Sequence, residues 1–176
     1  MFRRLFLVLI AFGIYAQASN LVLKKGNIIA HTEVFGDSSI DPATKNILAS
    51  LSMDLQDPTT LKGKVSVSLA SLLSDNLKRD SHMQEVLESN KFPNATYSIT
   101  SVENVNGKYK INGLFELHNV KKNITFNGEI VNDGNNVNLK IHGSFQMSEF
   151  GIEPPKLLFL KVRDKVDISG VLELNI

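Results

Sequence analysis

Side chains able to do acid–base, nucleophilic or metal chemistry are few and scattered in this chain. The four histidines, His31, His82, His118 and His142, include no pair at the i, i+2 or i, i+4 spacing that would bring two imidazoles to one metal ion. The absence of cysteine excludes thiolate metal sites, disulfides and a catalytic thiol. The sequence also contains neither a Gly-x-Ser-x-Gly turn nor a glycine-rich phosphate loop. We therefore expect no enzyme activity, no cofactor and no metal.

His82 is the histidine of most interest, because it follows Arg79 and Asp80 in a segment with helical spacing of its apolar residues. Asp80 is a suitable N-cap, and the proline of Phe92-Pro93 ends helical geometry. The pattern predicts a short helix at about residues 80–89, inserted between two strands. His118 and His142 fall on polar positions of strand-like segments, so we expect both to be exposed.

Outside that helix, apolar and polar residues alternate with a period of two, which is typical of half-buried β-strands. Two dipeptides, Asn106-Gly107 and Asp133-Gly134, separate alternating segments and favour the type I′ turn of a tight hairpin. Sequential hairpins make an antiparallel meander, and closing it with the first and last strands removes its exposed edges. The sequence therefore predicts one all-β domain, an antiparallel barrel. The clearest alternating segments are residues 64–69, 108–117, 123–130, 137–147 and 166–176.

The N-terminus has the features of a signal peptide. Arg3 and Arg4 precede an apolar stretch from Leu5 to Tyr15, and Ala16-Gln17-Ala18 offers a small-x-small cleavage site. The apolar stretch is shorter than the ~20 residues of a membrane-spanning helix, although a retained anchor is the alternative. We predict a signal peptide at residues 1–18 and an exported barrel at residues 19–176.

Charge and strand polarity limit the partners of the barrel. The formal net charge of +1 gives no electrostatic reason to expect nucleic acid or an anionic membrane. Lysines such as Lys108, Lys110 and Lys140 lie on the polar face of strong strands, where contact with lipid near the bilayer midplane would cost ~2–4 kcal/mol each. We therefore expect a barrel that is not embedded in a membrane, with its apolar face inside. The sequence leaves a homodimer open.

The predicted interior is apolar but contains glycines at inward positions: Gly113, Gly128, Gly143 and Gly170. These glycines either leave volume for a ligand or bend the strands at barrel corners. A cavity would take an apolar small-molecule lipid, with the hydroxyls of Tyr97 and Tyr109 or the imidazole of His82 holding a polar head. The alternative is a secreted solid-core β-barrel that acts as a protein-interaction module. The residues predicted to line the interior and contact the ligand are Val65, Val67, Tyr97, Ile99, Tyr109, Ile111, Phe115, Phe126, Leu139, Ile141 and Phe145.

Several short motifs, in order along the chain, resemble those of YceI-like proteins. Residues 79–83 (Arg-Asp-Ser-His-Met) and 91–97 (Lys-Phe-Pro-Asn-Ala-Thr-Tyr) are similar to that family's Arg-Asp-x-His-Leu and Phe-Pro-x-Ala-x-Phe stretches. Residues 113–122 resemble its Gly-x-Leu-Thr-Leu-x-Gly-Val-Thr-Lys segment, residues 148–152 its Ser-x-Phe-Gly-Ile element, and residues 164–166 its Asp-x-Val.

The resemblance implies a lipocalin-like barrel of eight antiparallel strands with an inserted helix, located in the periplasm or secreted. It also implies a long apolar ligand, such as a polyisoprenoid, an isoprenoid quinone or a fatty amide, that the protein binds and could transport or store. By position, Arg79, Asp80, His82 and Met83 would lie near the cavity mouth. His82 and Met83 are therefore added to the expected ligand contacts.

Overall fold

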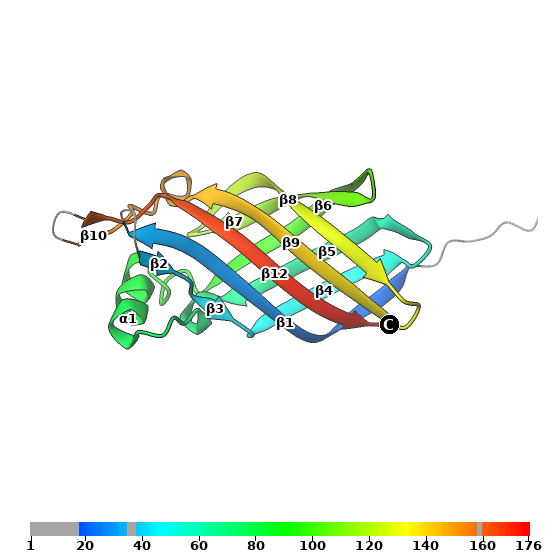
Figure 1. Cartoon of the computed structure of the whole chain (residues 1–176), viewed down its shortest axis with the longest axis horizontal. Coiled ribbons are helices and arrows are strands. Elements are labelled where there is room, and N and C mark those ends of the chain that lie inside the picture. The colour runs from blue at the N-terminus through cyan, green and yellow to red at the C-terminus, as the bar shows by residue number, and fades with distance from the viewer. Residues whose placement is uncertain (1–17, 35–37, 158–159) are drawn as a thin grey trace, which may run out of the picture.

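A computed structural model of the chain describes residues 18–34, 38–157 and 160–176 (Figure 1). The predicted signal peptide therefore lies outside the described residues, apart from Ala18. Eight long strands are β1 (Ser19–Val34), β4 (Ile47–Asp54), β5 (Asp57–Ser68), β6 (Asn94–Val105), β7 (Lys108–Leu117), β8 (Val120–Asn132), β9 (Asn136–Gln146) and β12 (Lys165–Asn175). The short elements are β2 (Ser38–Ile40), β3 (Ala43–Thr44), β10 (Lys156–Leu157), β11 (Leu160–Lys161), helix α1 (Leu77–Val86) and the 3₁₀ turns η1 (Leu69–Ser71) and η2 (Met147–Phe150).

The long strands form one closed antiparallel barrel, as predicted. They pair in the order β12-β9-β8-β7-β6-β5-β4-β1, and β1 pairs again with β12 to close the ring. The closing ladder runs from Val22 opposite Asn175 to His31 opposite Asp167. Closure gives every long strand a partner on both sides, so the barrel wall has no free edge.

The two ends of the barrel differ in how the strands are connected (Figure 1). At the end near the C-terminus, hereafter the closed end, strands are joined by residues 55–56, 106–107 and 133–135. At the opposite end, hereafter the mouth end, the connections include α1, β2, β3, β10 and η2. The hydrophobic residues are correspondingly divided into two clusters, one toward each end.

Both predicted hairpins are present, but only one of them has the predicted two-residue turn. Asn106 and Gly107 have φ values of 55° and 82°, which is the positive pair that a type I′ turn requires. The connection at Asp133-Gly134 also includes Asn135, so the two-residue turn predicted there is wrong. The Asp133 carboxylate accepts hydrogen bonds from the Asn135 and Asn136 N–H groups, 3.0 and 2.7 Å away, and this stabilises the wider loop.

The inserted helix is confirmed, but it begins earlier than predicted. Asn76 is the N-cap, because its side-chain oxygen accepts a hydrogen bond from the Arg79 N–H at 3.1 Å. Asp80, the predicted cap, lies within the first turn and is buried. Its carboxylate accepts hydrogen bonds from the Ser74 N–H and hydroxyl, at 2.8 and 2.7 Å. Asp80 thereby fixes the approach to the helix rather than its first N–H groups.

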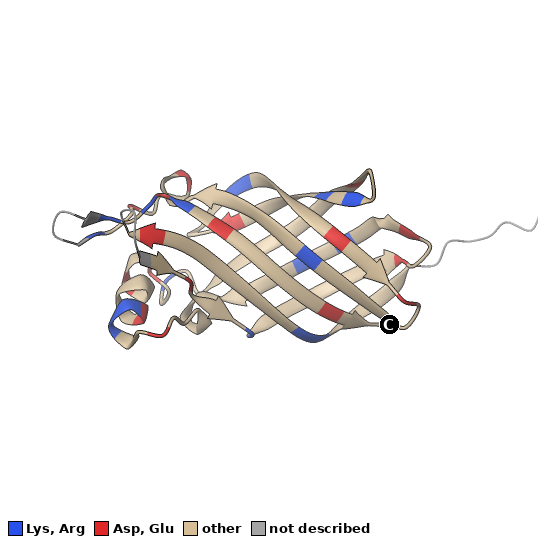
Figure 2. Cartoon of the chain, viewed as in Figure 1, with Lys and Arg blue, Asp and Glu red and all other residues tan. Residues whose placement is uncertain are grey.

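Positions of charged residues are spread along the strands and include both signs, as Figure 2 shows. Lys108, Lys110 and Lys140 are exposed there, as the alternating pattern predicts. In the part of the chain that the structure describes, no helix has the length and apolar character needed to cross a membrane.

Candidate functional site

A cavity of about 240 Å³ lies inside the barrel and extends to the mouth end. Strands supply most of its wall through inward-pointing aliphatic and aromatic side chains, and α1 with its C-cap contributes Met83, Val86 and Leu87. Among the lining residues that the structure describes, polar side-chain groups come from Thr32, Arg79, His82 and Tyr97. The wall is therefore suited to hydrocarbon and offers few partners to a polar ligand.

The structure places twelve of the thirteen predicted contact residues on the cavity wall. Tyr109 is the one that it does not place there. It is buried in the hydrophobic cluster toward the closed end, opposite Gly128 on β8. Alternation along a strand predicts which side chains point inward, but not how far along the barrel axis the cavity extends. The twelve are Val65, Val67, His82, Met83, Tyr97, Ile99, Ile111, Phe115, Phe126, Leu139, Ile141 and Phe145.

The inward glycines accommodate side chains of the neighbouring strand. A Cβ atom added at Gly113 would lie 2.4 Å from Cζ of Tyr97, and one at Gly143 would lie 2.5 Å from Cδ1 of Phe126. A Cβ at Gly128 would lie 2.8 Å from Cδ1 of Ile111. Protein atoms occupy this space, so the interpretation that these three glycines leave volume for a ligand is wrong.

The Tyr97 hydroxyl is directed at the main chain. It donates to the carbonyl oxygens of Ile111 and Ile124, at distances of 2.7 and 2.9 Å. Burial raises the pKa of this hydroxyl, and its ring packs edge-on against Phe126 with centroids 4.9 Å apart. Because one hydroxyl hydrogen is already shared between two carbonyls, Tyr97 contributes its ring to the wall and has no proton left to donate to a ligand head group. The expectation that the hydroxyl donates to such a head is therefore wrong.

Arg79 and His82 place nitrogen donors at the cavity mouth, on α1. Nδ1 of His82 lies 3.7 Å from a carboxylate oxygen of Glu85, and its side chain is 54% exposed. The ring can therefore turn without breaking a buried contact. The Asn76 cap and the buried Asp80 position this turn of the helix.

His118 is mostly buried, so the prediction that it is exposed is wrong. Its side chain is 16% exposed, with Nε2 2.6 Å from Glu88 and Nδ1 3.2 Å from the carbonyl oxygen of Phe150. The ring also packs edge-on against Phe92, with centroids 4.2 Å apart. His118 lies in the turn between β7 and β8 with a φ of 52°, so strand alternation no longer applies to it. His142, within β9, is exposed as predicted.

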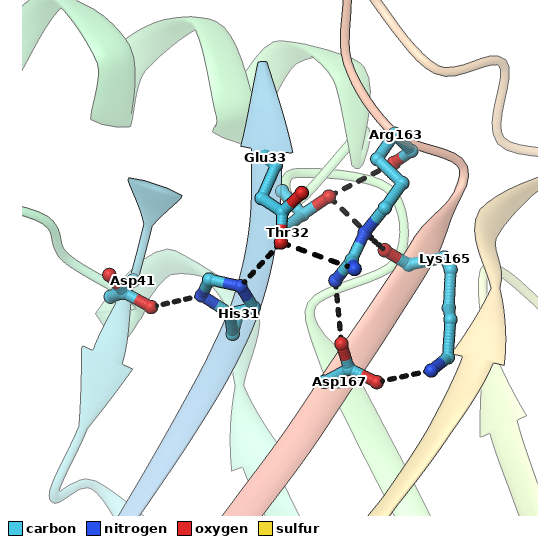
Figure 3. Close-up of polar contacts among 7 residues, drawn as sticks. All are labelled: His31, Thr32, Glu33, Asp41, Arg163, Lys165 and Asp167. Carbon is cyan, nitrogen blue, oxygen red and sulfur yellow. Dashed lines mark hydrogen bonds and ion pairs between the residues drawn. The ribbon is translucent and has the colours of Figure 1, made fainter. Parts of the chain in front are cut away.

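A second polar group at the mouth end surrounds His31 (Figure 3). The His31 ring contacts Asp41 and Glu33, and Arg163 contacts Glu33 and Asp167. Lys165 also reaches Asp167, at 2.8 Å. Sequence patterns did not reveal this group, because its members come from segments that are far apart in the chain.

Hydrogen bonds within this group shift the pKa values of its members. The hydrogen bond to Asp41, and then that to Glu33, raises the pKa of His31, while the bond from His31 lowers the pKa of Asp41. The hydrogen bond from Lys165, followed by that from Arg163, lowers the pKa of Asp167. Each shift favours the charged form.

Metal binding finds no support in the described residues, among which no group of three or more His, Cys, Asp or Glu side chains is placed to hold an ion. A closed barrel, an apolar cavity and a helix at its mouth are therefore the features that define the candidate site.

The YceI-like domain family matches residues 18–174. The chain belongs to this family. The resemblance found in its motifs is thereby confirmed, and neither the family match nor the names of its relatives assign a reaction.

Relatives include a UPF0312 protein of Shewanella oneidensis, 32% identical over 111 residues that cover 58% of each chain. A UPF0312 protein of Photorhabdus laumondii is 29% identical over 92 residues, which cover 51% of this chain and 48% of the relative. The chain thus matches only about half the length of these relatives.

Solved structures share the fold at low sequence identity. BcnA of Burkholderia cenocepacia superposes with a TM-score of 0.76 at 14% identity, covering 84% of this chain and 95% of its own. A polyisoprenoid binding domain from Saccharophagus degradans gives 0.70 at 12% identity, covering 89% and 97%. A Campylobacter jejuni YceI protein gives 0.65 at 23% identity, covering 76% and 82%.

Proposed function

We propose that this protein binds one long apolar molecule in its barrel and carries or stores it in the periplasm. A polyisoprenoid, an isoprenoid quinone or a fatty amide has the required chemistry. The observation that carries the proposal is the cavity itself, which is enclosed by aliphatic and aromatic side chains and extends to the mouth end. A structural neighbour described as a polyisoprenoid binding domain supports the same ligand class.

The size of the cavity favours a slender chain. A volume of about 240 Å³ is below the ~300–1,000 Å³ typical of small-molecule pockets, so a bulky ring system would fit poorly. Each buried methylene contributes about 0.8 kcal/mol, so ten of them would contribute about 8 kcal/mol before ordering costs. A hydrocarbon chain can therefore bind without specific polar contacts.

The polar end of such a ligand would lie at the mouth. A head group deep in the barrel would lose its hydration without gaining partners, because the Tyr97 hydroxyl already donates to the main chain. Arg79 and His82 offer nitrogen donors where the wall meets solvent. We therefore place the head group against α1 and the chain among the strand residues.

A solid-core interaction module is the alternative. It requires side chains to fill the barrel, whereas the structure has a cavity lined by residues from both core clusters. The mass-spectrometry experiment described next distinguishes lipid binding from the interaction module.

Native mass spectrometry of the protein from a bacterial periplasm tests the proposal. We expect a mature chain beginning at Ser19 with a mass excess that organic solvent removes as a lipid. Val65→Trp, which fills the cavity, should lower this excess severalfold, whereas Lys64→Trp, one residue away on the outer face, should retain it. A folded wild-type protein of bare mass that takes up neither quinones nor fatty amides would favour the interaction module.

A further inference from the structure

His31 lies at the mouth end with a carboxylate at each ring nitrogen (Figure 3). Its Nδ1 is 2.5 Å from Oδ1 of Asp41, and its Nε2 is 3.2 Å from Oε1 of Glu33. A neutral imidazole carries one N–H and could donate to only one of these oxygens, with a lone pair facing the other. Both contacts together require the doubly protonated imidazolium ring.

The charged groups around His31 come from four parts of the fold. Glu33 lies two residues along on β1, and Asp167 faces His31 across the ladder from β12. Arg163 precedes β12 and contacts Glu33 at 3.3 Å and Asp167 at 2.6 Å. Lys165 contacts Asp167, and the charge of Arg79 on α1 acts on Asp41 from farther away.

The two carboxylates that face His31 are not equivalent. Glu33 keeps the Arg163 guanidinium as a partner when His31 is neutral. Among the residues that the structure describes, Asp41 forms its ion pair with His31 alone. Loss of the ring proton therefore removes the positive charge that attracts Asp41 and leaves it at most a hydrogen bond from the remaining N–H.

Asp41 belongs to a segment that forms part of the cavity wall. Its neighbours Ile40 and Pro42 both line the cavity, while the Asp41 side chain is turned toward His31. The main chain ties this segment to β1 by pairing Ile40 with Thr32, and by a 2.9 Å hydrogen bond from the Ala30 N–H to the Pro42 carbonyl. The His31–Asp41 pair therefore reinforces the attachment of residues 40–42, hereafter the strap, to β1 at the mouth end.

We propose that the His31–Asp41 pair is an acid-stabilised latch on the cavity mouth. When His31 is protonated, the latch holds Ile40 and Pro42 against the bound ligand. When His31 loses its proton, the strap loosens and ligand exchange becomes faster. The inference rests on the proposed function, because the latch acts on the same cavity.

The direction of the pH dependence follows from the contacts of His31. Hydrogen bonds to Asp41 and Glu33 raise the pKa of His31 above its ordinary value of 6.5. The stabilisation is therefore fully present below about pH 6.5 and is lost as the pH rises through the raised value. The side chains of His31 and Asp41 are 32% and 50% exposed, so solvent screens their attraction. We therefore expect a modest effect, with ligand release about two- to fivefold faster at high pH.

Release of radiolabelled hexadecane into acceptor vesicles tests the latch, since this straight-chain hydrocarbon fits a slender cavity and has no titratable group. Wild-type release should be about two- to fivefold slower at pH 5.5 than at pH 8.5. In His31→Gln it should be fast at both pH values, because the amide carries no charge. His142→Gln changes an exposed histidine on β9 and should keep the wild-type profile. Wild-type release that does not vary with pH, or a His31→Gln profile like that of wild type, would overturn the proposal.

Hydrogen exchange tests the latch without a bound ligand, so its result is independent of the proposed lipid-binding function. Failure of the wild-type protein to take up the probe would count against the proposed function alone. The protection of the Ala30 amide, which donates to Pro42, then reports on the strap. Corrected for intrinsic exchange, this protection should fall from pH 5.5 to 8.5 in wild type and stay constant in His31→Gln. Equal pH dependence in both proteins would refute the latch.

Discussion

The closed end and the mouth end of the barrel are built from the same eight strands but differ in their connections and in what those connections carry. At the closed end, connections of two or three residues join strands whose inward side chains are fully buried, such as Met53 and Leu174, both 0% exposed. At the mouth end, longer connections carry the helix, the cavity opening and the ion pairs around His31. Side chains are buried at both ends, since Phe150 at the mouth end is also 0% exposed, so the ends differ in their connections and in the cavity opening that the mouth end carries.

The sharpest test of this difference compares two truncations. Leu174→Ala, at the closed end, should lower the free energy of unfolding by about 2–5 kcal/mol, because it creates a void in a packed cluster. Val67→Ala removes atoms that already border a cavity, so its loss should be about 1 kcal/mol. Urea unfolding of the ligand-free proteins measures both. Equal losses would show that the two ends are packed alike.

A second test concerns the close packing of Gly113 against Tyr97, whose ring lines the cavity. Gly113→Ala would put a methyl group 2.4 Å from the Tyr97 ring and 2.6 Å from the Ser98 carbonyl oxygen. We expect it to lower the free energy of unfolding by about 1–3 kcal/mol.

The double variant Gly113→Ala/Tyr97→Leu identifies the cause of that loss. If the ring clash dominates, the double variant should lose less than the sum of the two single losses. Additive losses in a double-mutant cycle would place the strain at the backbone contact with Ser98 instead.

The smallest expected effect on stability concerns the contact between Glu88, just after α1, and His118, in the turn between β7 and β8. Glu88 accepts a hydrogen bond from His118 there. This bond lowers the pKa of Glu88 below its ordinary value of 4.5, so the stabilisation is present above that pH and is lost as the pH falls through the lowered value. Glu88→Gln should therefore lower the melting temperature at pH 6 and match wild type near pH 3. Glu129→Gln, on the outer face of β8, is the control. A difference from wild type that is the same at both pH values would contradict this role.

The sequence predicts the closed end better than the mouth end because its rules are local. Alternation specifies which face of each strand is buried, and Asn106-Gly107 specifies a hairpin through backbone preferences of two residues. Ten of the eleven strand residues predicted to line the interior lie on the cavity wall for the same reason, since strand alternation separates inside from outside. His82 and Met83 lie on α1 and are predicted from the family resemblance instead.

The mouth end depends on contacts between distant segments, which no local pattern encodes. The start of the helix is a local exception, because Asn76, directly before Leu77, is the N-cap, while the Asp80 carboxylate accepts hydrogen bonds from Ser74. His118 is buried because Glu88 and the carbonyl of Phe150 surround it. Neither partner could be inferred from the residues adjacent to the histidine.

Pairing of β1 with β12 has a consequence for the order of folding. The ladder from Val22–Asn175 to His31–Asp167 joins the two ends of the domain, so no shorter part of the chain can complete the ring. Hairpins such as β6–β7 can form early, but the final ladder has to overcome the entropy of closing a very long loop. Until the last strand docks, β1 and β9 present unpaired edges, and the slow step in folding coincides with the period of greatest risk of aggregation.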